Sequence, residues 1–310
     1  MTIARRILPR LLLGVVVLWG AATLTFLAIY VIPGDTALLI LGGPDARPTP
    51  EALAAVRAEY LLDEPFIVQY LHYLANVAQG DLGQSYRLRI PVAEAIGQQL
   101  GSTATLAGVA AALAIFLTVV VAVLSAQRAP WIRRIVSSIE VFLAAAPSFV
   151  IGFGLLFLFA FTFRLLPSGG SNGLAALILP AVTLALVLFG PLSQVLRNEL
   201  EEVLEQPFVL TARARGLSDL AVRLRHALRH AAIPAVTMTG FIVGGLLGGS
   251  VIAETLFSRS GVGSLMLQSV YNKDLPVILG IVLLSAAVFV VVNLIVDLAY
   301  TAIDPRVVTS

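Results

Sequence analysis

Six runs of predominantly apolar residues constrain this chain more than any other feature of its sequence. A helix rises 1.5 Å per residue, so about 20 residues cross a hydrocarbon layer about 30 Å thick. The runs cover residues 11–32, 102–126, 135–163, 174–196, 235–253 and 277–303. Charged residues make up 12% of the chain, whereas soluble domains carry about 25%. The sequence therefore predicts an all-α integral membrane protein with six transmembrane helices.

Polar segments between the runs divide the chain and predict its orientation. We expect an N-terminal transmembrane helix over 1–33, an extracytoplasmic segment over 34–101, a five-helix core over 102–303 and a cytoplasmic tail over 304–310. Arginine and lysine are more frequent on the side that holds both termini and the 197–234 loop, and this excess marks the cytoplasmic side. Apolar residues at helical spacing within 50–79 predict short helices on the outer membrane surface.

The 197–234 loop is predicted to contain two short helices. Pro207 suits the first turn of a helix that runs to Arg215, and Gly216 suits the left-handed position after its end. Ser218 is a good N-terminal cap for a second helix, with one apolar and one basic face, that ends before Pro234. Two capped helices form a compact element that is presented to a partner. A basic amphipathic helix that rests on lipid headgroups is the alternative.

Small residues and prolines inside the runs are candidates for helix packing or for a transport pathway. Gly240, Gly244 and Gly248 recur at intervals of four, so they share one helical face that another helix can approach closely. Pro147, followed by Ser148, interrupts the third run, and broken helices are frequent along transport routes. A structural kink is the alternative for the proline, and simple packing is the alternative for the glycines.

The segment after the fifth run is a candidate gate or a contact for a binding protein. Its glycines predict a tight turn that dips back into the protein. The residues singled out are Glu254, Phe257, Gly261 and Gly263.

The sequence offers little for catalysis. It has no cysteine, no HExxH motif and no GxSxG motif, so no catalytic, cofactor-binding or metal-binding residues are predicted. The single lysine, Lys273, lies on the predicted outer side, so the chain cannot carry a P-loop that faces cytoplasmic ATP. A proton-coupled secondary transporter that uses Asp297 or Glu140 remains a second hypothesis. An intramembrane hydrolase ranks last, because no histidine lies in a run.

Several short motifs, in this order and spacing, resemble those of the permease subunit of bacterial ABC importers of the dipeptide/oligopeptide (peptide/nickel) family. They are Ile32-Pro-Gly-Asp35, Gly80-Asp-Leu-Gly83 with Ser85 and Pro91-Val92, Pro147-Ser-Phe, Thr211-Ala-Arg-Ala-Arg-Gly-Leu217, Arg225-His-Ala-Leu-Arg229, Glu254-Thr-Leu-Phe-Ser258 with Gly261-Val-Gly263, and Asp304-Pro-Arg306. The resemblance covers nearly the whole chain. Leu210 and Thr211 depart from the general importer signature, which has Glu and Ala at these positions, as they do in the peptide branch.

The resemblance implies a type I ABC importer permease in the bacterial inner membrane, bound to membrane lipid and not to nucleic acid. It implies a second homologous permease, two ATPase subunits that bind ATP and Mg²⁺, and an extracytoplasmic peptide-binding protein. The implied substrates are di- and oligopeptides, with nickel or glutathione as alternatives. The residues implied to couple to an ATPase are Pro207, Phe208, Thr211, Ala212, Arg213, Ala214, Arg215 and Gly216. Phe208 would be an apolar anchor, and Arg213 and Arg215 would meet acidic residues.

Overall fold

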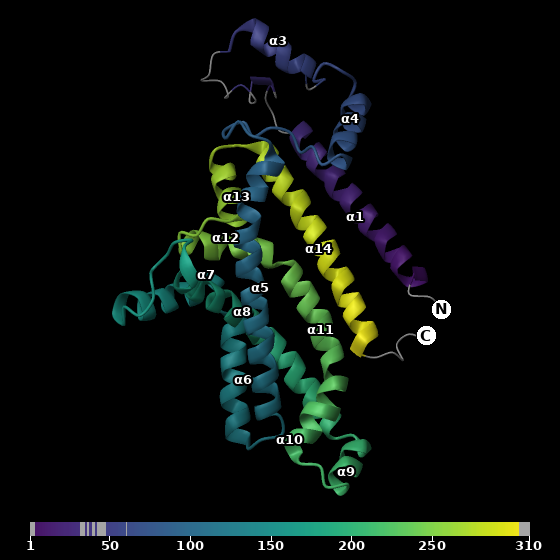
Figure 1. Cartoon of the computed structure of the whole chain (residues 1–310), viewed down its shortest axis with the longest axis vertical. Coiled ribbons are helices and arrows are strands. Elements are labelled where there is room, and N and C mark those ends of the chain that lie inside the picture. The colour runs from purple at the N-terminus through teal and green to yellow at the C-terminus, as the bar shows by residue number, and fades with distance from the viewer. Residues whose placement is uncertain are drawn as a thin grey trace. The chain divides into compact units, whose positions relative to one another are not determined.

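The computed structural model describes residues 4–31, 35, 37–38, 41, 48–59 and 61–303. Among these residues the regular structure is helical, apart from one antiparallel bridge between Gln84 and Pro91 (Figure 1). The helices are α1 Ala4–Val31, α3 Pro50–Glu59, α4 Phe66–Ala78, α5 Val92–Ser125, α6 Pro130–Ala145, α7 Ser148–Leu155, α8 Gly173–Leu204, α9 Pro207–Ala214, α10 Asp219–Val222, α11 Leu228–Gly244, α12 Leu246–Leu256, α13 Val262–Tyr271 and α14 Leu275–Ile303; η2 Leu156–Thr162 and η3 Arg223–Ala227 are π-helical. The short helices predicted within 50–79 are present as α3 and α4.

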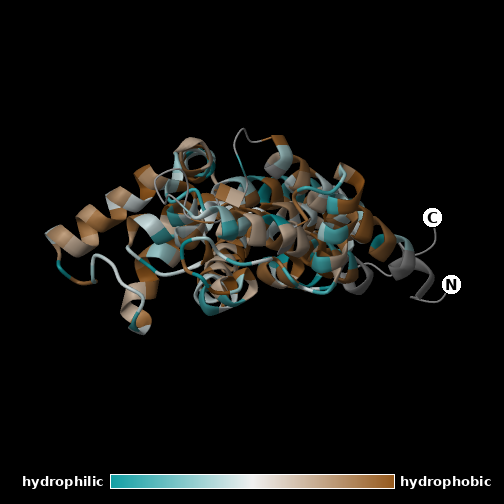
Figure 2. Cartoon of the chain, turned by 90° about the horizontal axis from the view of Figure 1, so that it is seen from above, coloured by the Kyte–Doolittle hydropathy of each residue, from teal (hydrophilic) through white to brown (hydrophobic). Residues whose placement is uncertain are grey.

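Five helical segments of the described residues are long and apolar enough to cross a membrane. They cover Pro9–Ala28, Val92–Ser125, Gly173–Leu204, Asp219–Gly244 and Leu275–Leu298. A sixth is added when Pro130–Ala145 and Ser148–Thr162, which are bent by 110° relative to each other, count as one span. Figure 2 shows that hydrophobic residues are spread over many of the helices. The prediction of an all-α membrane protein with six spans agrees with this count.

The third predicted span is bent sharply at Pro147. Ala146 has an extended backbone, with φ −72° and ψ 129°, and Pro147 becomes the N-terminal cap of α7. A residue before proline is disfavoured in the helical conformation, so α6 ends where the proline begins. Both α6 and α7 still pack against α8.

Three predicted boundaries in and between the fourth and fifth runs are wrong. Helix α8 continues eight residues beyond 196, to Leu204. The second helix of the 197–234 loop does not end before Pro234, because α10, η3 and α11 form one continuous span over Asp219–Gly244. The span ends at Gly244 instead of continuing to 253, and the separate short helix α12 follows Gly245. Adjacent glycines weaken a helix at that point because they have no side chain to restrict the backbone.

The described residues fall into two compact units. The first holds the residues up to 101 together with 264–290, and the second holds 102–263 and those from 291 onward. In the first unit, aromatic side chains join α1 to α4. The ring centroids of Phe26 and Tyr70 lie 5.3 Å apart, and the hydroxyls of Tyr70 and Tyr73 lie 2.7 Å and 3.0 Å from those of Thr23 and Thr25.

A carboxylate holds the segment between α4 and α5 in place within the first unit. The buried Asp274 side chain, just before α14, accepts hydrogen bonds from the Ser85 hydroxyl and from the backbone N–H groups of Tyr86, at 3.1 Å, and Arg87, at 3.3 Å. A carboxylate that accepts several donors is well satisfied although it is buried. The connection fixes residues 85–87 to the loop between α13 and α14.

Further along the first unit, Arg57 of α3 donates a hydrogen bond of 2.6 Å to Asp35. The guanidinium holds the pKa of that carboxyl below its usual range. The preceding Pro33 and Gly34, which belong to one of the recognised motifs, lie outside the described residues, as do Asp304, Pro305 and Arg306.

Helix α8 is the centre of the second unit. Most of its apolar residues from Ala176 to Leu204 are buried, and α6, α7, α11 and α12 all pack on it. Pro180 and Pro191 lie inside α8 without ending it. Gly190 allows the backbone of α6 to approach closely, because a β-carbon there would lie 2.7 Å from the backbone nitrogen of Ala144.

Candidate functional site

Helix α9 and its surroundings form the candidate coupling surface. The helix begins at Pro207 and ends at Ala214, within one residue of the prediction. Proline costs no helical hydrogen bond in the first turn, because the N–H groups there have no partner within the helix. In Figure 1, α9 lies at one end of the second unit, beside α10.

The backbone conformation at the end of α9 explains why a glycine follows the helix. Gly216 has a φ of 84°, a left-handed conformation that a residue with a β-carbon adopts at a cost. Its N–H donates to the carbonyl of Arg213 at 2.9 Å, and the N–H of Leu217 donates to that of Ala212 at 3.4 Å. These two bonds satisfy carbonyls that the last turn leaves open and fix the direction of the chain after the helix.

One face of α9 packs on the protein and the other is exposed. Val209 and Ala212 belong to a cluster of buried side chains from α5, α8 and α11. Phe208 packs against this cluster, and its ring centroid lies 5.4 Å from that of His230. Leu210 is 73% exposed. The apolar side chain that α9 presents outward is therefore Leu210, whereas the predicted anchor Phe208 faces the protein.

The remaining predicted coupling residues Thr211, Ala214 and Arg215 are exposed beside Leu210, while Arg213 is held by a carboxylate. Arg213 lies 2.9 Å from Asp219, and the same carboxylate pairs with Arg223 at 2.8 Å. An acid and a base four residues apart lie on one helical face, so the pair of Asp219 and Arg223 was readable from the sequence, although we did not predict it.

Arg223 extends this chain of contacts to the end of α5. Its side chain is 3% exposed, and it donates hydrogen bonds to the carbonyls of Val123, at 2.8 Å, and Ala126, at 2.7 Å. The last carbonyls of a helix have no partner within the helix and carry partial negative charge, so a cation is favoured there. Helix α9 is thus joined to α5 through Asp219 and Arg223, by charged contacts as well as apolar packing.

Glu140, a candidate for proton relay, lies in a buried ion pair between α6 and α8. Its carboxylate is fully buried and lies 2.8 Å from Nη2 of Arg197, which is itself 5% exposed. The hydroxyl of Ser193 donates to the same carboxylate at 2.6 Å. The Ser193 hydroxyl and two guanidinium nitrogens of Arg197, all from one face of α8, therefore give this buried carboxylate its hydrogen-bond partners, as a structural connection requires. The other candidate, Asp297, is half-buried in α14.

The predicted gate loop after α12 folds back onto α5. Glu254, Phe257, Gly261 and Gly263 are all buried. Thr103 of α5 donates its hydroxyl to Glu254 at 2.6 Å and accepts the backbone N–H of Val262 at 2.8 Å. A β-carbon at Gly261 would collide with the Glu254 carboxylate, so a larger residue there would have to displace that side chain. Phe257 packs separately, against Leu156 and Leu179.

The predicted small-residue face is only partly a contact surface. A β-carbon at Gly240 would collide with Val296 of α14, so α11 and α14 approach closely there. Gly244 is buried at the end of α11, and a β-carbon at Gly248 would meet open space. Ser148 is half-buried at the start of α7, next to the exposed Pro147. The structure therefore places the glycines and Pro147 at separate points and does not join them into one site.

Two family models together match almost the whole chain. The model described as "Binding-protein-dependent transport system inner membrane component" matches residues 114–309, and its N-terminal companion matches residues 3–107. The chain therefore belongs to the family of inner membrane components of binding-protein-dependent transport systems. It is a multi-pass inner membrane permease.

Individual relatives place the chain within the ABC permeases. A Brucella abortus protein named "Putative peptide transport system permease protein" is 37% identical over 310 residues, which is 97% of this chain and 98% of the relative. The "Glutathione transport system permease protein GsiC" of Salmonella typhimurium is 36% identical over 302 residues, and the "Probable peptide ABC transporter permease protein" of Sinorhizobium fredii is 34% identical over 310, each with the same coverage. The predicted resemblance to ABC importer permeases is confirmed.

Proposed function

We propose that this chain and a second, homologous permease form the pathway through which an ABC importer moves di- or oligopeptides into the cell. In this proposal an extracytoplasmic binding protein delivers the peptide, and two ATPase subunits bind ATP and Mg²⁺. The support for the substrate class is that full-length relatives carry the names of peptide and glutathione permeases. Glutathione is itself a tripeptide, so both names point to small peptides.

The surface proposed to couple to an ATPase is the exposed face of α9, with Leu210 as its apolar contact. The observation that carries this proposal is the division of α9 into a face anchored in the protein and a face with an exposed leucine. In docked interfaces a large apolar side chain forms the buried centre of the contact and polar residues form its rim, which is the arrangement expected for Leu210 when a partner covers it. Arg215 beside it favours an acidic partner surface.

The anchored face gives α9 a means of transmitting movement. Val209 and Ala212 pack among the ends of α5, α8 and α11, and Asp219 with Arg223 joins α9 to the carbonyl end of α5. Packed elements of this kind move together as rigid bodies. A displacement of α9 by closure of the ATPase subunits would therefore move these helices, and the pathway would change between outward and inward openings.

The orientation of the chain is part of the proposal. An excess of arginine on one side of the membrane supports cytoplasmic termini and a cytoplasmic α9, with α3 and α4 outside. The segment from Glu254 at the end of α12 to Gly263 then faces outward, where it would contact the binding protein or act as a gate.

Single cysteines test both orientation and docking, because the chain has no cysteine of its own. Leu210→Cys and Leu165→Cys are matched variants, since the two leucines are 73% and 69% exposed. In vesicles with the extracytoplasmic face outward, an impermeant maleimide should label Leu165→Cys and spare Leu210→Cys. A bifunctional maleimide should join Leu210→Cys, and not Leu165→Cys, to an ATPase subunit that carries a cysteine. Labelling of Leu210→Cys from outside would refute the proposed orientation.

Transport assays test coupling and substrate in the reconstituted complex. Arg213→Asp should lower peptide uptake while ATP hydrolysis continues, because it replaces the ion pair to Asp219 with a repulsive contact. Arg225→Asp makes the same charge change at an exposed position outside α9 and should leave uptake unchanged. Unlabelled peptides should compete with the transported peptide. Uptake of nickel without uptake of any peptide would reject the substrate class.

A further inference from the structure

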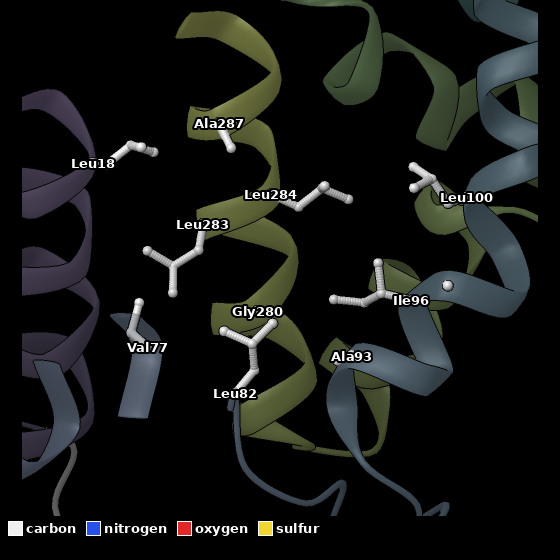
Figure 3. A pocket seen from close by; sticks show the side chains of 11 residues that line it. Leu18, Val77, Leu82, Ala93, Ile96, Leu100, Gly280, Leu283, Leu284 and Ala287 are labelled. Atoms are coloured by element: carbon white, nitrogen blue, oxygen red, sulfur yellow. The ribbon is translucent and has the colours of Figure 1, made fainter. Parts of the chain in front are cut away.

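An apolar cavity of about 360 Å³ lies among α1, α4, α5 and α14, within the first unit. Only carbon atoms of side chains are seen facing it in Figure 3. Leu18 comes from α1, Val77 from α4, Ile96 and Gly97 from α5, and Leu283 from α14. The volume lies at the lower end of the range for ligand sites, about 300–1,000 Å³.

Close helix contacts limit this cavity at two places. A β-carbon at Gly14 would lie 2.7 Å from Cγ1 of Val290, so α1 and α14 touch about one turn beyond Leu18. A β-carbon at Gly280 would lie 2.6 Å from Cγ1 of Val92, so α14 and α5 touch beside the cavity. The aromatic contacts between α1 and α4 fix the remaining wall. The cavity is therefore a wedge between helices that touch elsewhere.

The chemistry of the lining selects an apolar ligand. A peptide inside this wedge would leave its backbone N–H and C=O groups without hydrogen-bond partners, at a cost of several kcal/mol for each group in an apolar medium. Lipid acyl chains carry no such groups. The wedge follows α14 from Gly280 to Ala287, which is about 10 Å, compared with roughly 15 Å for the hydrocarbon of one leaflet.

We propose that this wedge is a binding site for one acyl chain of a membrane phospholipid, which fills the space between α1, α5 and α14. The position of the lining residues supports this occupant. Leu18 and the residues of α14 belong to helices that are long and apolar enough to span the membrane, and this chain is an inner membrane component. Membrane lipid therefore surrounds the open side of the wedge. The proposal rests on family membership and is independent of the transported substrate.

Two glycines of α5 provide a matched pair of test variants. A β-carbon at Gly97 or at Gly101 would meet no atom within 4 Å, so a side chain can be attached at either position without a clash at its first carbon. Gly97 lines the wedge, and Gly101, one turn further along the same helix, is exposed and does not. Both substitutions change helix propensity equally. Gly97→Leu fills the wedge, whereas Gly101→Leu leaves it open. Ala93→Leu is a second filling variant.

The experiment uses the intact permease complex in native membrane vesicles that contain a phosphatidylethanolamine with a photoreactive diazirine within its acyl chain. After illumination, the labelled peptides are identified by mass spectrometry. The wild type should be labelled on residues that line the wedge. Gly97→Leu should lower this labelling by about tenfold, since hydrophobic pockets reject extra methylene groups by such factors. Gly101→Leu should change it by no more than about twofold.

Three results would overturn the proposal. Equal labelling in the wild type, Gly97→Leu and Ala93→Leu would mean that the probe reports lipid around the protein and not lipid in the wedge. The absence of labelled wedge residues in the wild type would mean that no acyl chain enters. A cross-link from Gly97→Cys to another permease chain, with no lipid label, would assign the wedge to a protein contact. Because none of these readouts depends on uptake, a failure of the proposed function would leave this inference standing.

Discussion

Removal of Arg197 should destabilise the second unit more than any surface change, because it isolates a fully buried acid. The guanidinium donates to Glu140 through Nε, at 3.3 Å to both oxygens, and through Nη2, at 2.8 Å. Arg197→Met keeps much of the side-chain length and removes all of these donors. Ser193 then remains as the described donor to the carboxylate. Leaving one member of a buried ion pair behind costs about 3–5 kcal/mol.

Removal of Glu140 in place of Arg197 should lower the free energy of unfolding by less. In Glu140→Met, Arg197 keeps a second carboxylate, Glu201, at 3.5 Å, and the side chain of Glu201 is 16% exposed. The guanidinium therefore retains a partner near the edge of the buried region. The double variant removes both charges and leaves two apolar side chains, an exchange that is often neutral or stabilising in buried pairs. We expect the double variant to be more stable than Arg197→Met by about 2 kcal/mol or more.

The free energy of unfolding, measured by titration with sodium dodecyl sulfate in mixed micelles, gives the four corners of this double-mutant cycle. Arg133→Met is the control, since Arg133 is 59% exposed and lies 3.9 Å from Glu201. Its effect should stay within about 0.5 kcal/mol. The reasoning is wrong if the double variant loses as much stability as the sum of the two single variants, because the two side chains would then act independently.

Three further substitutions should have separate effects. Gly240→Leu should lower the free energy of unfolding by about 1–3 kcal/mol through overpacking against Val296. Adding Val296→Ala should recover part of that loss. The control Gly248→Leu should change the free energy of unfolding by no more than about 0.5 kcal/mol. Gly216→Ala should cost about 1–2 kcal/mol at a left-handed position, and faster hydrogen exchange at the end of α9 would report it; unchanged exchange would contradict the assigned cap. Asp274→Asn should cost about 1–3 kcal/mol, because backbone donors lose a carboxylate acceptor, and should speed proteolysis at residues 85–91; equal cleavage rates would contradict the fastening role.

Local sequence signals predicted the spans, the coupling helix and an interruption at Pro147, but they do not explain why two other prolines leave their helix intact. Pro147, Pro180 and Pro191 carry the same restriction on the preceding residue, and the chain breaks at the first and stays helical through the other two. Helix α8 is packed on several sides, with α6 against Gly190, and this packing can support a helix through its prolines. That support comes from residues far apart in the sequence, which single-sequence patterns do not report.

In the candidate site, too, the local features of α9 were predictable from the sequence and its tertiary contacts were not. The start at Pro207 and the end at Gly216 are encoded within a few residues, so the bounds of α9 were predictable. Which side of α9 faces the protein depends on the ends of α5, α8 and α11, so the exposure of Leu210 and the burial of Phe208 were not. The pairing of Glu140 with Arg197 joins residues 57 positions apart and has no local signature.

The hydrogen bonds that hold residues 85–87 to Asp274 determine which kinds of mutation disturb this segment. Asp274 reaches Tyr86 and Arg87 through their backbone N–H groups, which any residue except proline provides. Their side chains are half-buried or exposed and are not bound by that carboxylate. Mutation of either side chain therefore leaves the two backbone hydrogen bonds to Asp274 available. An insertion, by contrast, would shift the backbone donors away from the carboxylate, so the hydrogen bonds to Asp274 are more sensitive to a change in loop length than to a change of these side chains.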